Sequence, residues 1–135
     1  HQKIRGSRFD EHEHEEHEFF LPLQGEIRIR AGGRALGAGP GRMIYLPPGT
    51  PHEFESSAKS EGERLIVLID AKTWNRFDGA RLESGAGPSS QLARELLFHL
   101  LLHPKSKGVG ALVETLVRTL SETLVESAAF ESSVH

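Results

Sequence analysis

The chain has 135 residues, of which 37% are hydrophobic, with 14 Gly, 7 Pro and no Cys. This length fits one domain, and the many turn-forming residues favour a β domain over a helical bundle. The absence of Cys excludes disulfides, thiolate nucleophiles and cysteine-ligated zinc. The net charge of −3 argues against nucleic-acid binding by this chain alone. No apolar run approaches the roughly 20 residues that span a bilayer, so we expect a soluble cytoplasmic protein with no membrane partner.

Residues 1–77 are predicted to form short strands separated by turns. Residues 26–30 alternate apolar and charged side chains, as in a half-buried strand, and residues 19–23, 43–46 and 65–69 are apolar runs. Between them, residues 31–34 read Ala-Gly-Gly-Arg, a pattern typical of a tight hairpin turn because glycine tolerates positive φ. Strands this short and closely spaced predict an antiparallel sandwich or barrel.

The pattern changes after the strands. Residues 78–90 are rich in Gly, Ser and Pro and predict a linker or exposed loop. From residue 91 the apolar period becomes helical, and Pro104 ends the first helix. A second helix is expected over residues 109–126, so that residues 91–135 form a helical hairpin for packing and dimerisation.

A leucine stripe runs along the second predicted helix. Its members are Leu112, Leu116, Leu120 and Leu124. The side chains of such a stripe can be buried in two ways: by packing on the barrel, or by pairing with the same helix of a second subunit across a two-fold axis. We expect the first helix to do the former and the second helix, wholly or partly, to do the latter in a homodimer.

Acidic and histidine side chains crowd residues 10–18. His12 and His14 are two positions apart, so both imidazoles would project from one face of a strand, and Glu18 has the same parity. His52 follows a proline-rich turn and belongs to another predicted strand. If a barrel brings these four together, they form a ligand set for one divalent transition metal: Fe, Mn, Ni, Zn or Cu. The alternative is a solvated acidic face. His17, with the opposite parity, is expected to be exposed, unless a shifted register lets it replace His14.

The spacing of these residues resembles two motifs of the cupin superfamily. Gly6, His12, His14, Glu18 and Gly25 follow the pattern of its first motif. The second motif is matched by Gly41, Pro47, Gly49 and His52, with Ser56 where the family usually has Asn. The resemblance covers roughly residues 6–70. It implies a cupin-type antiparallel β-barrel or jelly roll, with His12, His14, Glu18 and His52 as the metal ligands.

The sequence contains few other motifs that indicate catalysis or ligand binding. Neither a G-x-S-x-G nucleophile turn nor a phosphate-binding loop is present, and we predict no catalytic residue. Phe20, Tyr45 and Phe54 are candidates for lining a pocket, with simple core packing as the alternative.

A barrel followed by paired helices is similar to the N-terminal sensing and dimerisation region of AraC-family transcription regulators. This resemblance implies a small-molecule effector, a homodimer, and DNA contact only through a helix-turn-helix module that lies outside this chain. The alternative is a stand-alone metal-dependent cupin enzyme of dioxygenase or isomerase type. A third possibility is a storage or scaffold cupin without a ligand.

Overall fold

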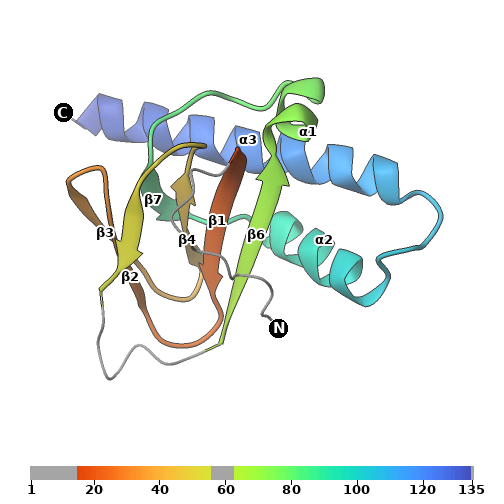
Figure 1. Ribbon diagram of the computed structural model, residues 1–135, viewed down its shortest axis with the longest axis horizontal. Coiled ribbons are helices and arrows are strands. Elements are labelled where there is room, and N and C mark those ends of the chain that lie inside the picture. The colour runs from red at the N-terminus through yellow and green to blue at the C-terminus, as the bar shows by residue number, and fades with distance from the viewer. Residues whose placement is uncertain (1–14, 56–62, 135) are drawn as a thin grey trace.

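The computed structural model describes residues 15–55 and 63–134. In these ranges, seven strands form two antiparallel sheets, and three helices accompany them (Figure 1). The strands are β1 (Glu16–Pro22), β2 (Ile27–Ala31), β3 (Arg34–Ala38), β4 (Arg42–Leu46), β5 (His52–Phe54), β6 (Arg64–Asp70) and β7 (Gly85–Pro88). The helices are α1 (Ala71–Arg76), α2 (Gln91–Leu102) and α3 (Val109–Val134).

Two facing sheets enclose an inner core. The larger sheet has the strand order β6-β1-β4-β7 and the smaller sheet has the order β3-β2-β5. The buried side chains of the inner core are Phe20, Ile27, Ile29, Ala31, Leu36, Ala38, Ile44 and Leu46. This architecture confirms the predicted fold class, a mainly β jelly-roll arrangement followed by a C-terminal pair of α-helices.

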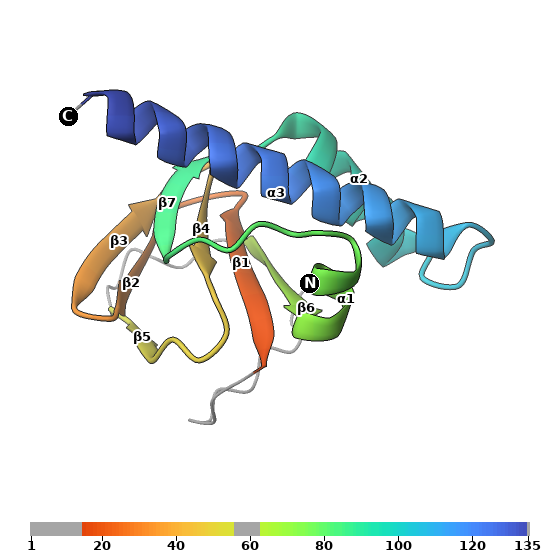
Figure 2. The ribbon, with the colours of Figure 1, turned by 90° about the horizontal axis from the view of Figure 1, so that it is seen from above.

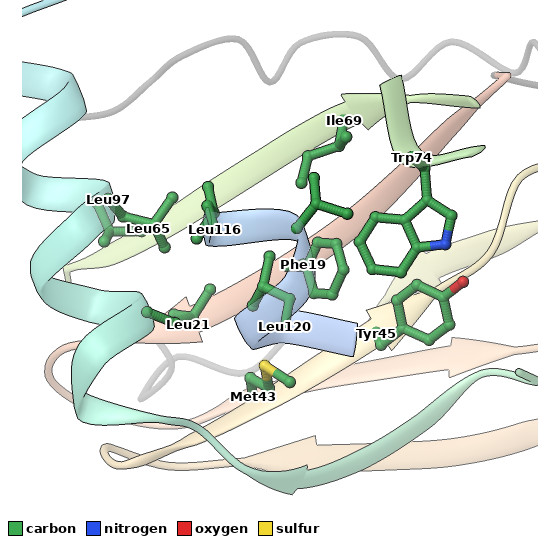
Figure 3. Close-up of a cluster of buried hydrophobic side chains, with 12 residues drawn as sticks. Phe19, Leu21, Met43, Tyr45, Leu65, Ile69, Trp74, Leu97, Leu116 and Leu120 are labelled. Atoms are coloured by element: carbon green, nitrogen blue, oxygen red, sulfur yellow. The ribbon is translucent and has the colours of Figure 1, made fainter. Parts of the chain in front are cut away.

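The helices lie against the outer face of the larger sheet (Figure 2), and a second core lies between them and the sheet. Phe19 and Leu21 project from β1 into this core, whereas Phe20 between them projects into the inner one. Trp74 of α1 and Leu120 of α3 are fully buried against these side chains (Figure 3). Because both cores take residues from β1, the apolar run of this strand is continuous instead of alternating.

The predicted hairpin turn is present between β2 and β3. Ala31 and Arg34 are paired across the two strands, and Gly32 and Gly33 have φ values of +57° and +82°. Side chains with a Cβ rarely adopt such angles, which is why glycine occupies both positions.

The linker predicted for residues 78–90 is wrong for Gly85–Pro88, which form strand β7 at the edge of the larger sheet. Its sequence, GAGP, has low β propensity, so pairing with β4 determines the conformation instead. The small residues also let α3 approach closely, since a Cβ on Gly87 would lie 2.8 Å from Ser127 Oγ. The barrel therefore extends through this segment.

Both predicted helices of the C-terminal hairpin are present. Ser90 caps α2 by accepting a hydrogen bond from the Ala93 amide at 3.2 Å, and the helix ends two residues before Pro104. The second helix, α3, continues to Val134, beyond the predicted end at residue 126. The short helix α1 was not predicted; Asp70 caps it by accepting from the Thr73 amide at 2.8 Å.

Replacing Gly79 with alanine is expected to destabilise the fold. The chain wraps the Trp74 indole here: Trp74 Nε1 donates to the Ala80 carbonyl at 2.9 Å, and a Cβ on Gly79 would overlap the indole ring. We expect Gly79→Ala to cost about 1–3 kcal/mol, the usual range for overpacking, measured by urea unfolding. Gly85→Ala is the control because its Cβ would meet nothing within 4 Å. Equal stability of the two variants would contradict the close packing of Gly79 against the Trp74 indole.

Candidate functional site

Two of the four predicted metal ligands, Glu18 and His52, lie side by side between the sheets. His52 Nε2 is 3.4 Å from Glu18 Oε1, and the side chains are only 18% and 12% exposed. His12 and His14 lie outside the described residues. Within the described ranges, no group of three or more His, Cys, Asp or Glu side chains is placed to hold a metal ion. A complete four-ligand set would therefore draw on His12 and His14.

The turn before β5 orients the His52 ring. Thr50 Oγ1 donates to the Pro47 carbonyl at 2.8 Å, and His52 Nδ1 lies 3.0 Å from the Thr50 carbonyl. A carbonyl oxygen only accepts, so Nδ1 donates and Nε2 is left to face Glu18. In the neutral ring this nitrogen presents a lone pair to a carboxylate, and two acceptors in this position need a proton or a cation between them. Imidazole nitrogen and carboxylate oxygen are donors that suit divalent transition metals.

The structure divides the three aromatic residues predicted to line one pocket. Phe20 and Phe54 lie near His52 on the inner side, with the rings of Phe20 and Phe54 5.6 Å apart in an edge-to-face arrangement. Tyr45 pairs with Phe19 across β1 and β4, and directly opposed residues share a face of the sheet. Tyr45 therefore belongs to the outer core and lines a groove that Phe20 and Phe54 do not line, so the three aromatic residues are not gathered around one pocket.

His17 is buried on the outer face of β1, contrary to the expectation that it would be exposed. Its Nδ1 lies 2.8 Å from the Tyr45 hydroxyl, and its ring stacks on Trp74 with centroids 4.6 Å apart. The signal was present in the sequence, because His17 has the parity of Phe19 and Leu21. In a strand buried on both faces, the face opposite Glu18 is also an interior.

Burial controls the protonation of this pair. It lowers the pKa of His17 from its usual 6.5 to about 4, with a smaller contribution from the positive charge of Arg81. Burial also raises the pKa of Tyr45 from 10.0 to about 12. Both side chains are therefore neutral at pH 7, and they act there as hydrogen-bonding groups without charge.

A groove of about 1250 Å³ opens above His17 and Tyr45. Residues 81–87 and the side chains of Leu124 and Ser127 on α3 form parts of its walls. The groove lies beside the helices and also takes residues 34–37 of β3 into its walls, whereas Glu18 and His52 lie between the sheets. No pattern in the sequence indicates this groove, because its walls come from segments that are distant in the chain.

The leucines predicted to mediate dimerisation are divided between two environments. Leu116 and Leu120 are buried in the outer core of this same chain, so their assignment to a subunit interface is wrong. Leu112 and Leu124 are half-buried. Among the residues whose burial is described, the large apolar side chains that remain exposed on the helical layer lie mainly on α2: Leu92, Phe98, Leu101 and Leu102, together with Val125 on α3.

The fold and motifs define this part of the chain as a cupin domain. Residues 4–69 match the family model described as "Cupin domain", and this region belongs to the cupin superfamily. No helix in the described part of the chain is long and apolar enough to cross a membrane.

Two relatives extend the likeness beyond the barrel. The chain is 27% identical over 116 residues to an uncharacterized HTH-type transcriptional regulator, YobQ of Bacillus subtilis (strain 168), covering 86% of this chain and 47% of that protein. The crystal structure of the AraC-like transcriptional activator CuxR aligns with a TM-score of 0.59 and 16% identity, covering 83% of this chain and 43% of that one. The second likeness concerns the fold. The chain spans less than half the length of either relative.

Truncation of Leu120 is expected to destabilise the monomer. The side chain is fully buried between α3 and the sheet, and Leu120→Ala should cost about 2–5 kcal/mol through lost contacts and a residual cavity. Leu102→Ala is the matched control, because Leu102 is 74% exposed and its truncation should change the free energy of unfolding by less than about 0.5 kcal/mol. Urea unfolding measures both; a small effect at Leu120 would contradict the helix–sheet packing.

Proposed function

We propose that this chain is the effector-sensing and dimerisation region of an AraC-type transcriptional regulator, with a metal-binding cupin pocket. The observation that carries the proposal is that barrel and helices form one packed unit, joined by Leu97, Leu116 and Leu120. The sequence likeness to an HTH-type regulator covers both the barrel and the helices. Its 116 aligned residues are 86% of this chain and must include most of the residues after the barrel. DNA contact would come from a helix-turn-helix module outside this chain.

Glu18 and His52 would hold the metal, completed by His12 and His14. The hydrogen bond from His52 Nδ1 to the Thr50 carbonyl would keep the ring fixed with Nε2 directed at the ion. When bound, such a metal supplies a Lewis-acid centre. Phe20 and Phe54 would limit the access of water on this side of the sandwich.

Protein purified without a histidine tag is expected to contain a near-stoichiometric divalent transition metal by elemental analysis. His12→Ala combined with His52→Ala should remove it, because two of the four donors are lost. The control is His99→Ala with His103→Ala, since these rings lie 4.7 Å apart at the end of α2 and could bind metal adventitiously. Metal that is lost only in the control, or absent after growth with ample metal, would refute the cupin site.

The identity of the metal separates the regulator from a second candidate, a metal-dependent cupin enzyme. The Glu18–His52 pair favours this candidate as well, because a carboxylate and imidazoles are also ligands of iron enzymes. Iron or manganese in the site would favour the enzyme, and zinc or nickel would favour the regulator.

The dimer surface of the proposed regulator would lie on α2. Phe98, Leu101 and Leu102 are 41%, 52% and 74% exposed and share one face of the helix, being three and four positions apart. Leu101 also borders an apolar groove of about 400 Å³ between α2, α3 and β6. Exposed leucines beside an apolar groove are self-complementary, as a two-fold interface requires, so the proposed occupant is a second copy of the chain.

Leu101→Glu combined with Leu102→Glu is expected to give a folded monomer, because two charges would be buried in each half of the interface. Analytical ultracentrifugation measures the mass, and circular dichroism checks the fold. Val125→Glu, a comparably exposed position on α3, is the control and should remain dimeric. A monomeric unmodified chain at micromolar concentration, or a dimer that tolerates both glutamates, would contradict the proposed surface.

A further inference from the structure

The groove above His17 and Tyr45 has the size of a ligand site. Small-molecule pockets usually measure about 300–1,000 Å³, and this groove, at about 1250 Å³, is larger and has room for such a molecule. Its walls come from β1 and β4 of the larger sheet, from β3 of the smaller sheet, from residues 81–87 and from α3. It lies on the opposite face of β1 from Glu18 and His52, so a molecule held there would not be a ligand of the cupin metal.

The floor of the groove holds a polar pair in a fixed position. His17 Nδ1 is hydrogen-bonded to the Tyr45 hydroxyl, and Trp74 stacks on the imidazole. Among the described residues, no protein atom makes a hydrogen bond to His17 Nε2. A ring that is buried, oriented and left with one open position can hydrogen-bond a ligand without further ordering.

The rim of the groove is positively charged. Arg34 and Arg81 line it, and Glu83 is the one carboxylate among the described residues around it. The Arg34 guanidinium is held by a 2.7 Å hydrogen bond to the Ser84 carbonyl. Arg81 lines the same groove as His17 and Tyr45, so its guanidinium belongs to the same site as the polar pair. Two cations against one anion favour a negatively charged ligand.

Apolar side chains form part of the remaining walls, which include α3. Leu36, Met43 and Leu124 line the groove, which suits a ligand with a hydrophobic body. Ser127, one turn further along α3, also lines it, and its Oγ fills the space beside Gly87. The helix therefore rests directly on β7 at the edge of the groove, and a molecule bound there would touch α3.

We propose that this groove binds a small organic anion with an apolar body, held by Arg34 and Arg81 and by the His17–Tyr45 pair. Its contact with α3 makes binding sensitive to the position of that helix. The binding of the anion does not depend on the proposed function. Only its role as the effector of a regulator rests on that proposal.

The probe for this site is 8-anilinonaphthalene-1-sulfonate, an aromatic body carrying one sulfonate. Its uncharged analogue N-phenyl-1-naphthylamine has the same body without the anion. We expect the sulfonate to bind the intact chain saturably, and fluorescence titration measures this binding. Arg34→Gln and Arg81→Gln should each weaken it about tenfold, the effect of one charge-assisted hydrogen bond, and leave the uncharged analogue unaffected.

Three further variants locate the probe. Arg28→Gln removes an equal charge from an exposed position on β2 and should not change binding. Leu101→Glu tests the apolar groove beside α2 and should not change it either. Gly85→Phe should abolish binding of both probes, because a side chain at this open position enters the groove. The proposal would be overturned by either of two results. One is sulfonate binding that does not change in Arg34→Gln, Arg81→Gln and Gly85→Phe, and the other is sulfonate binding that is lost in Leu101→Glu.

Failure of this site and failure of the regulator proposal give different results. If the chain dimerises through α2 but Arg34 and Arg81 do not affect the sulfonate, the groove is overturned and the regulator stands. If the variants behave as expected in a chain that remains monomeric, the groove is supported and the dimer surface fails.

Discussion

The burial of β1 on both of its faces is the constraint on which the rest of this structure depends. Phe20 enters the core between the sheets, and Phe19 and Leu21 enter the core beneath the helices. The same alternation continues into the polar end of the strand, where Glu18 faces the smaller sheet and His17 faces α1 and α3. One strand therefore contributes to two chemically different sites, and the helical layer that covers the outer face makes His17 an interior residue.

This double burial also explains which parts of the structure follow from the sequence. The cupin spacing predicted that Glu18 and His52 would meet, because the residues that make the turns and the donors are local signals with fixed offsets. The Gly32–Gly33 hairpin and the start of α2 are local in the same sense: their φ values and capping hydrogen bonds are set within a few residues. His17 was misassigned because the parity argument assumed a solvent-exposed outer face.

The other errors arise where tertiary contacts decide the conformation. The residues of β7 have no β propensity of their own and become a strand by pairing with β4. The leucine stripe of α3 has the same appearance whether it packs on its own barrel or on another subunit, since both partners are apolar. Leu120 is completely buried in the monomer, which shows that this part of the stripe packs on its own barrel. The leucines available for contact with a second subunit are therefore the exposed ones of α2.

The turn between β4 and β5 connects the two proposed sites. Pro47 and Pro48 line the outer groove, and the Pro47 carbonyl accepts the Thr50 hydroxyl in the turn that orients His52. A ligand that prefers one position of this turn would change the placement of His52 Nε2 relative to Glu18. Linkage requires the reverse effect to be equal in free energy, so a metal at the inner site would alter the affinity of the groove by the same factor.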